Sequence, residues 1–419
     1  MSTTPLTTPP TPLPFQISIP PSTLSTFKSK LLAAEFPDEL QSSQWDMGVP
    51  LAEMKRLTKA FAEWDWRQAE RELNLVPQFV TPVEVEGFGG VDVHFVWERS
   101  EVEGAVPLLF VHGVRPGSFL EVLPLIPHLR KPGGPAFHII APSLPNFGFS
   151  SGIKTRGFGI AQYAETCHKL MLSLGYPQYV TQGGDWGFYI TRAIGHLYPD
   201  SCMASHINML RAPPPKFKKN PILATQHKLT SYTKAEEEGF KRTEWFAQEG
   251  RGYYMEQATK PQTLAYALTD SPVALLAWIY EKMHDWTDEY PWSDEEVFRW
   301  VAIYAFSRAG PGAAHRIYYE TMHTGEGGIT RDIVEGWIPK VKLGLAYNPK
   351  EISVLPATWC RTLGPVVYEA FNESGGHFYA TEKPALLARD LRTMFGKGGG
   401  AYKVVKGRSG YASGRLAKL

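Results

Sequence analysis

Six residues, Gln182–Gly187, have the types and spacing of a catalytic turn. They read Gln-Gly-Gly-Asp-Trp-Gly, with a short apolar run over 179–182 before them and a helical stretch after them. Small residues two places before and after Asp185 allow the sharp strand-to-helix turn called a nucleophile elbow, which usually carries Ser. The alternative is an aspartate that only caps the following helix. As a nucleophile, Asp185 would displace a group from an sp³ carbon and form an ester.

This chemistry limits the substrate and requires a base. Epoxides and haloalkanes are the two obvious electrophiles, and water must then hydrolyse the ester with the help of a base and an oxyanion hole. Behind such an elbow the chain order is nucleophile, acid, histidine. His377 follows an expected strand over 366–371, and Glu351 precedes it. The alternatives are an ordinary loop histidine and a first-turn helix acid after Asn348.

Backbone N–H groups beside Asp185 would form the oxyanion hole. Trp186 is one natural donor, and the loop 112–117 should supply the other from Val114 or Arg115. Opening a strained ether also requires a donor to the leaving oxygen. A tyrosine phenol suits this role because it stays protonated at neutral pH. The helical segment described below contains several tyrosines, including the neighbouring pairs 253–254 and 318–319.

Short apolar runs predict the sheet that must position these groups. Runs over 107–111, 137–141 and 179–182 each end in a turn with Gly or Pro, and helical stretches separate them. This pattern indicates a parallel sheet built from βαβ units, with its chemistry at the carboxyl ends of the strands. Strict alternation over 91–96 predicts a further strand with one buried face.

Helix signals divide the rest of the chain. Helical periodicity runs over 22–75, capping boxes lie at 233–236 and 293–296, and Ser271 precedes a proline at a first helical position. We therefore expect an all-helical insertion over the sheet. The predicted parts are an N-terminal segment (1–90), the first part of an α/β core (91–212), a helical lid (213–339), the second part of the core (340–402) and a flexible basic tail (403–419).

Composition excludes several classes of function. The 419 residues are 43% hydrophobic, and 43 basic residues nearly balance 42 acidic ones. A large core is therefore expected, and nucleic acid is not an expected partner. Three cysteines show no metal spacing and no disulfide framework, which favours a reducing compartment. The longest apolar stretch, 273–280, is far shorter than the roughly 20 residues that span a bilayer.

The two termini bear on location. The first 22 residues lack the basic start and apolar run of a signal peptide, so we do not expect secretion. The last three, Ala417, Lys418 and Leu419, resemble the address read by the peroxisomal import receptor. An accidental tripeptide is the alternative. A cytoplasmic or peroxisomal location is expected, and a homodimer stays open because no motif encodes it.

Together these motifs resemble those of the α/β-hydrolase-fold epoxide hydrolases, in the microsomal-type branch that includes fungal and juvenile-hormone enzymes. The resemblance extends over roughly 14–395. Residues 183–187, 348–351 and 375–378 are similar to the family's nucleophile, acid and histidine motifs. The resemblance implies an α/β-hydrolase fold with an N-terminal meander and an inserted helical lid. The three motifs then assign nucleophile, acid and base to Asp185, Glu351 and His377.

The resemblance also selects between neighbouring tyrosines. Tyr253 lies seven residues before a basic-Pro pair and Tyr318 two residues before a glutamate, as the family's two donors do. The resemblance further implies a small apolar epoxide and water as reactants, a vicinal diol as product, and neither metal nor organic cofactor. The loop 112–118 departs from the family's His-Gly-Trp-Pro-Gly-Ser by one extra residue and a missing aromatic. The choice between Val114 and Arg115 as oxyanion donor therefore stays open.

Two other interpretations compete with epoxide hydrolysis. A haloalkane dehalogenase shares the aspartate nucleophile and often the following tryptophan. It binds the leaving halide with N–H donors rather than with a pair of tyrosines. The second alternative is an inactive homologue that binds an apolar ligand or a protein partner. Its support is the extra residue at 114–115, whereas an intact nucleophile, acid and histidine argue against it.

Overall fold

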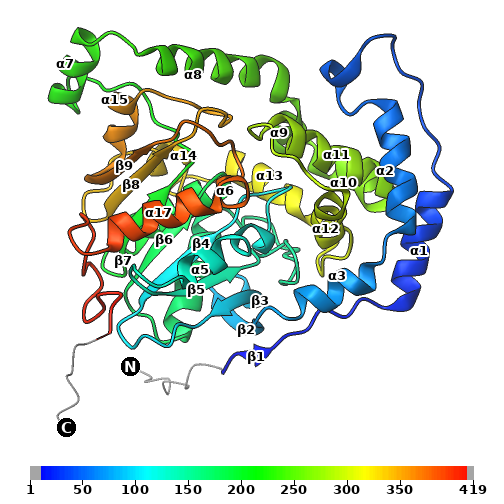
Figure 1. Ribbon diagram of the computed structural model, residues 1–419, viewed down its shortest axis with the longest axis horizontal. Helices are drawn as coiled ribbons and strands as arrows, with labels where there is room; N and C mark the ends of the chain where they lie inside the picture. Colours follow the sequence, from blue (N-terminus) through cyan, green and yellow to red (C-terminus); the bar gives the residue numbers. More distant parts are fainter. Residues whose placement is uncertain (1–10, 413–419) are drawn as a thin grey trace.

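The computed structural model describes residues 11–412 of the chain. At its centre is a nine-stranded sheet with the order β1-β2-β3-β5-β4-β6-β7-β8-β9 (Figure 1). All pairs from β5 to β9 in this order are parallel, whereas β1, β2 and β3 form an antiparallel edge. The strands are β1 (Leu13–Pro14), β2 (Gln78–Val85), β3 (Gly89–Glu98), β4 (Val106–Val111), β5 (Phe137–Pro142), β6 (Tyr179–Gly183), β7 (Cys202–Ile207), β8 (Lys342–Tyr347) and β9 (Val366–Phe371).

The apolar runs of the sequence form the centre of this sheet. β4 and β6 are buried over their whole length, as expected for parallel strands covered on both faces. The strands expected from apolar runs are confirmed as β4, β5, β6 and β9. The alternation over 91–96 predicted one buried face for β3, but His94 and Val96 are buried as well. Phe15 and Phe119 both pack edge-on against the His94 ring, which explains the burial of this second face.

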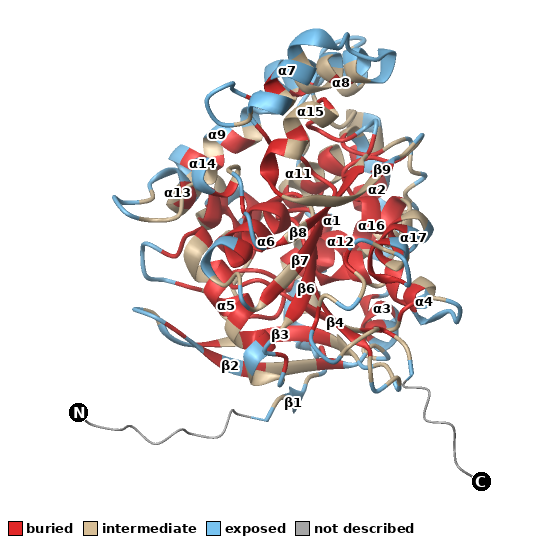
Figure 2. Ribbon diagram, turned by 90° about the vertical axis from the view of Figure 1, so that its left-hand side faces the viewer, coloured by how far each residue is buried: buried red, intermediate tan, exposed pale blue. Residues whose placement is uncertain are grey.

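Helices cover both faces of the sheet. α5 and α6 pack on one face, and α4 and α17 lie on the other (Figure 2). The carboxyl ends of the parallel strands meet at one edge, where the loops with the predicted site residues begin. The helices of this part are η2 (Phe119–Val122), α4 (Leu125–Arg130), α5 (Ile160–Ser173), α6 (Trp186–Leu197), α15 (Ala357–Cys360), η5 (Arg361–Leu363), α16 (Tyr379–Glu382) and α17 (Pro384–Phe395).

A run of helices separates β7 from β8 in the chain. The expected helix starts are confirmed: Ser271 caps α11, and capping boxes open α8 at Thr233 and α12 at Ser293. These polar caps satisfy backbone N–H groups that the first helical turn leaves free. The helices are α7 (Pro221–Leu229), α8 (Lys234–Trp245), η3 (Phe246–Gly250), α9 (Gly252–Thr259), α10 (Pro261–Asp270), α11 (Pro272–Asp285), α12 (Asp294–Ala305), η4 (Ala313–His315), α13 (Arg316–Met322) and α14 (Arg331–Val334).

The N-terminal helices lie against this inserted run rather than against the sheet centre (Figure 1). Aromatic residues make the contact: the Phe61 ring stacks on Phe298 with centroids 4.5 Å apart, and Phe27 meets Phe306 at 5.1 Å. Such pairs add to the burial of their apolar area. The helices involved belong to the set α1 (Pro21–Leu32), η1 (Gln44–Met47), α2 (Leu51–Glu63) and α3 (Trp66–Leu73).

The expectation of a flexible tail from residue 403 is wrong for residues 403–412. The N–H of Gly410 donates to the Gly104 carbonyl at 2.7 Å, and the Gly410 carbonyl accepts from Ala136 at 2.7 Å. Val405 is buried. Basic and glycine-rich composition suggested flexibility, but the glycines serve as turns that let the segment pack beside the starts of β4 and β5.

Two expectations concern membranes and targeting. None of the helices within residues 11–412 has both the length and the apolarity to cross a membrane. Ala417, Lys418 and Leu419 lie outside the described residues. The peroxisomal address therefore stays a prediction.

Candidate active site

Asp185 occupies the turn between β6 and α6 with an uncommon backbone conformation, φ 51° and ψ −127°. The flanking glycines make this turn sterically feasible. A Cβ on Gly187 would lie 2.0 Å from the Val111 carbonyl oxygen, and one on Gly183 would lie 2.6 Å from the Gly187 carbonyl oxygen. The Asp185 carboxylate makes no capping bond to α6. The capping alternative is therefore wrong, and a strained turn that aims one side chain is typical of functional sites.

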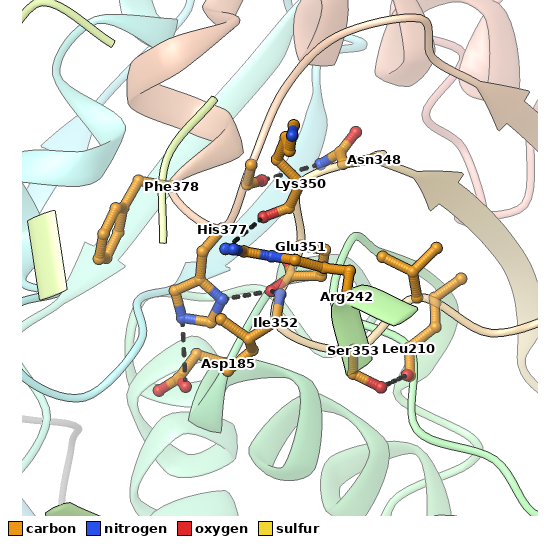
Figure 3. A network of polar contacts seen from close by, with 12 residues as sticks. Asp185, Leu210, Arg242, Asn348, Lys350, Glu351, Ile352, Ser353, His377 and Phe378 are labelled. Atoms are coloured by element: carbon orange, nitrogen blue, oxygen red, sulfur yellow. Dashed lines mark hydrogen bonds and ion pairs between the residues drawn. The ribbon is translucent and has the colours of Figure 1, made fainter. Parts of the chain in front are cut away.

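The structure brings Asp185, His377 and Glu351 together (Figure 3). His377 Nε2 lies 3.3 Å from Asp185 Oδ2, and His377 Nδ1 lies 2.5 Å from Glu351 Oε1. The loop that carries Glu351 is not helical, so the alternative of a first-turn helix acid is wrong. The Lys350 N–H donates to the Gly375 carbonyl at 3.1 Å, which joins this loop to the histidine loop.

The charges around His377 determine its proton affinity. Burial disfavours the imidazolium, but the carboxylates of Glu351 and Asp185 outweigh burial and raise the pKa of His377 well above its ordinary value. The Glu351 oxygen that faces His377 also accepts from the Ile352 N–H at 2.8 Å, which fixes its direction. His377 in turn donates its backbone N–H to the Trp286 carbonyl at 2.8 Å, at the end of α11.

Of the two candidate oxyanion donors in the loop after β4, Val114 is the one that bonds to Asp185. Its N–H donates to Asp185 Oδ1 at 2.7 Å. Gly113 permits this approach, because a Cβ there would lie 2.9 Å from the Cβ of Asp185. Trp186 is the first residue of α6, so its N–H has no acceptor within the helix. The Val114 N–H thus lies beside the carboxyl group that would carry an oxyanion. Trp186, the next residue after Asp185 in the chain, stays the expected second donor.

Arg115 directs its side chain away from the nucleophile. Its guanidinium is buried, donates to the Pro311 carbonyl and lies 3.1 Å from His315 Nε2. It also lies over the Tyr304 ring at 4.5 Å from the centroid. The extra residue of the loop is therefore packed between the sheet edge and the inserted helices.

Glu121 is a titratable group near the site that sequence reasoning missed. Its Oε1 accepts from the Gly113 N–H at 3.1 Å, inside the loop that holds the oxyanion donor. Burial raises the pKa of Glu121 to about 8, and the charge of Asp185 adds to this rise. The sequence offers no clear signal for it, because a single glutamate in an otherwise apolar stretch is also typical of an exposed position.

A cavity of about 210 Å³ opens above Asp185. Tyr253 and Tyr318, the two tyrosines singled out by the sequence, both line it, and their ring centroids are 6.1 Å apart. Burial raises the pKa of both phenols above the ordinary value, and the charge of Asp185 adds to the rise. Both phenols therefore keep their protons and can donate them. Tyr319 instead accepts from Arg156 at 3.2 Å, outside the cavity.

The cavity lining is mixed in polarity. It combines aromatic and aliphatic groups with three arginines, where an apolar epoxide was expected as the substrate. The lining residues are Asp185, Trp186, Tyr189, Met209, Arg211, Thr243, Phe246, Ala247, Arg251, Tyr253, Tyr254, Tyr318, Arg331 and Ile352. Arg211 was not predicted as a site residue because the strand before it, β7, contains polar residues and was not recognised in the sequence. Recognition of that strand would have placed Arg211 at the carboxyl edge.

Comparison with known proteins identifies the family of this chain. The family model described as epoxide hydrolase N terminus matches residues 12–122, and the one described as alpha/beta hydrolase fold matches residues 106–268. The solved structure of the Aspergillus niger epoxide hydrolase is 34% identical with a TM-score of 0.78, covering 92% of this chain and 96% of that one. Both family models and this structure agree with the α/β fold described above.

More distant relatives extend the family beyond fungi. The juvenile hormone epoxide hydrolase of the silkworm Bombyx mori is 28% identical with a TM-score of 0.78, covering 91% of this chain and 93% of that one. Epoxide hydrolase 1 of Sus scrofa is 29% identical, covering 91% of this chain and 88% of its own length. The chain therefore belongs to the epoxide hydrolases of the α/β-hydrolase fold, in the branch with the fungal, mammalian and juvenile-hormone enzymes.

Proposed function

We propose that this protein converts an epoxide into a vicinal diol through a covalent ester on Asp185. The observation that carries the proposal is the shared cavity: the Asp185 carboxylate and two protonated phenols line the same space. A carboxylate can attack an epoxide carbon only if the ring oxygen receives a hydrogen bond or a proton as it leaves. Tyr253 and Tyr318 supply that donor opposite the nucleophile. The helical segment 213–339 acts as a lid that carries both tyrosines.

In the first half-reaction, an Asp185 oxygen forms a bond to the less hindered epoxide carbon while the carbon–oxygen bond of the ring breaks. The electron pair of that bond passes to the ring oxygen, which takes a proton from one of the two phenols. Asp185 is prepared for attack because Val114 and His377 fix its carboxylate from two sides. Such positioning converts a bimolecular encounter into a reaction between oriented groups.

In the second half-reaction, water attacks the carbonyl carbon of the Asp185 ester. His377 accepts a proton from that water, and the Val114 and Trp186 N–H groups stabilise the tetrahedral oxyanion. Collapse releases the diol and restores the carboxylate. One proton of the water ends on the hydroxyl freed from the ester, and the other restores the tyrosine. The extra residue in the loop is compatible with this role because Val114 still reaches Asp185.

The charge state of Asp185 controls when His377 can act as a base. In the free enzyme two carboxylates raise the pKa of His377. In the ester Asp185 is neutral, so of the two carboxylate charges only that of Glu351 remains beside His377. The proton affinity of His377 therefore falls at the stage that requires a neutral imidazole. Glu351 holds the ring with its Nε2 toward the ester.

The two rival functions fit this cavity less well. A dehalogenase needs N–H donors that hold a halide, whereas phenols face Asp185 here. An inactive homologue would not require the short contacts that join His377 to Asp185 and Glu351. Both alternatives are tested by the experiment below.

The test is a single turnover in water enriched in heavy oxygen, with excess enzyme and styrene oxide, followed by mass spectrometry of the diol and the protein. The ester route puts an oxygen from Asp185 into the diol and the heavy label into Asp185. Label in the diol alone would mean direct attack by water and would overturn the nucleophilic role. Absence of diol from any epoxide tried, with halide release from haloalkanes, would favour the dehalogenase.

A further inference from the structure

The charges that line the active-site cavity do not balance. Its lining contains the guanidinium groups of Arg211, Arg251 and Arg331, against the single carboxylate of Asp185. A wholly apolar substrate would leave these charges facing it in a partly dry space, which is unfavourable. The arginines are therefore either held by the protein itself or available to an anionic part of the substrate.

Two of the three arginines are held by the protein. Arg331 donates to the Tyr254 hydroxyl at 2.9 Å and to the Tyr189 hydroxyl, and it lies 3.7 Å from Glu335. Arg251 is exposed and lies over the Tyr254 ring at 5.4 Å from its centroid. Arg331 is therefore paired within the protein, and the charge of exposed Arg251 stays in contact with water.

Arg211 has no such explanation. It is half-buried and lines the cavity, yet it forms no hydrogen bond or ion pair with any of residues 11–412. The preceding residue is fixed, because the Leu210 carbonyl accepts from the Ser353 hydroxyl at 3.0 Å (Figure 3). The positive charge of Arg211 also acts on Tyr253, where it opposes the rise in pKa caused mainly by burial. The guanidinium is therefore close to the groups that would bind an epoxide.

We propose that the preferred substrate is a compact epoxide that also carries a carboxylate, and that Arg211 binds this carboxylate. This inference rests on the proposed function and adds a substrate class to it. A planar guanidinium offers parallel N–H donors that match a carboxylate in a bidentate pair. The cavity of about 210 Å³ limits the molecule to a small skeleton, with the epoxide against Asp185 and the carboxylate at Arg211.

The test compares matched substrates that differ in one charge. The probes are 4-(oxiran-2-yl)benzoate and its neutral amide, together with the 3-substituted pair, which places the charge at a second position on the ring. In the wild-type enzyme, kcat/KM should be at least roughly tenfold higher for a benzoate than for its amide. Arg211→Gln should lower kcat/KM for that benzoate roughly 10- to 100-fold, mainly through KM. The loss for the amide should be smaller, so the benzoate-to-amide ratio of kcat/KM should fall toward one, and an unchanged circular dichroism spectrum shows that the variant is folded.

Two further variants separate a specific pair from general charge. Arg211→Lys keeps the charge without the fork and should retain part of the preference. Arg71→Gln removes a charge from the exposed face of α3, where the side chain is 70% exposed, and should leave both substrates unchanged. Equal turnover of benzoates and amides by the wild type, or an undiminished preference in Arg211→Gln, would overturn the inference while epoxide hydrolysis stands. Failure to hydrolyse amides, benzoates and styrene oxide alike would overturn the proposed function itself.

Discussion

At the residue scale, the proposed mechanism gives His377 a role as base in one half-reaction only. Its imidazole is buried between Asp185 and Glu351, and the proposed role as base belongs to the second half-reaction alone. The attack of Asp185 on the epoxide does not need this base. Removal of the imidazole should therefore stop the enzyme at the ester rather than before it.

We expect His377→Gln to form one equivalent of ester and then to stall. Its kcat should fall roughly 10³-fold or more, because general-base help to the attacking water is lost. Intact-protein mass spectrometry after mixing with styrene oxide should show a gain of one substrate mass. Asp185→Ala serves as the control and should show no gain. Steady turnover by His377→Gln without accumulated ester would contradict the assignment.

Glu121 predicts a pH dependence of stability. Its pKa of about 8 in the folded protein exceeds the ordinary 4.5. Between these two pH values the folded state keeps a proton that the unfolded state has lost. The free energy of unfolding should therefore fall as pH rises from about 4.5 to 8. Glu121→Gln removes this fall, since the amide cannot ionise and can still accept from Gly113.

Urea unfolding at pH 5 and pH 9 measures this effect. At pH 5, Glu121→Gln should be as stable as the wild type. At pH 9 it should be more stable by on the order of 2–4 kcal/mol. Glu326→Gln removes an exposed carboxylate and is the matched control, with no such gain expected. An equal effect of Glu121→Gln at both pH values would refute the raised pKa.

At the scale of elements, the elbow depends on close packing between α6 and the strands. Gly187→Ala should destabilise the fold by roughly 3 kcal/mol or more, because its Cβ would meet the Val111 carbonyl oxygen at 2.0 Å and backbone atoms cannot move aside. Gly195→Ala, in the same helix, is the control. There the Cβ would lie 3.1 Å from a Val341 methyl group, and the gain in helix propensity offsets the contact. Chemical denaturation of both variants checks the difference.

The elements that could be predicted are those with an uninterrupted pattern. β4, β5 and β6 are apolar runs buried in the sheet, and β9 is a half-buried edge strand. The caps of α8, α11 and α12 follow local hydrogen-bond chemistry. β7 and β8 were not predicted, because β7 contains buried polar residues such as Ser205 and His206 and β8 is interrupted by Gly344. A long-range partner satisfies Ser205, whose hydroxyl accepts from the Thr181 hydroxyl at 2.9 Å.

The same distinction holds for the candidate site. Asp185, His377 and Glu351 stand in motifs of fixed chain order, and the structure brings them together. Arg211 and Glu121 belong to no motif, and only the folded structure identifies them. Arg211 matters because no residue among 11–412 pairs with it, and Glu121 matters because it is buried. Local sequence shows neither property.

At the scale of the whole molecule, distant segments of the chain hold the helical insertion in place. Arg56 on α2 forms an ion pair with Asp294 on α12 at 2.7 Å, and Lys30 on α1 pairs with Asp270 at 2.6 Å. These pairs are exposed and contribute little stability. The buried stacking of Phe61 on Phe298 contributes more, because it removes apolar area from water. The N-terminal helices thus fix the segment that carries Tyr253 and Tyr318.

The C-terminal segment 403–412 packs beside the starts of β4 and β5. Two of its glycines test how much this packing stabilises the fold. Gly407 and Gly410 have nearly equal positive φ values, 72° and 78°, so alanine strains the backbone similarly at both. A Cβ on Gly410 would lie 2.4 Å from the Pro135 Cβ, whereas one on Gly407 meets nothing within 4 Å. Gly410→Ala should therefore lower the free energy of unfolding by roughly 1–3 kcal/mol more than Gly407→Ala does. Urea unfolding of the two variants measures the difference, and equal losses would mean that this segment does not stabilise the fold through its packing against β5.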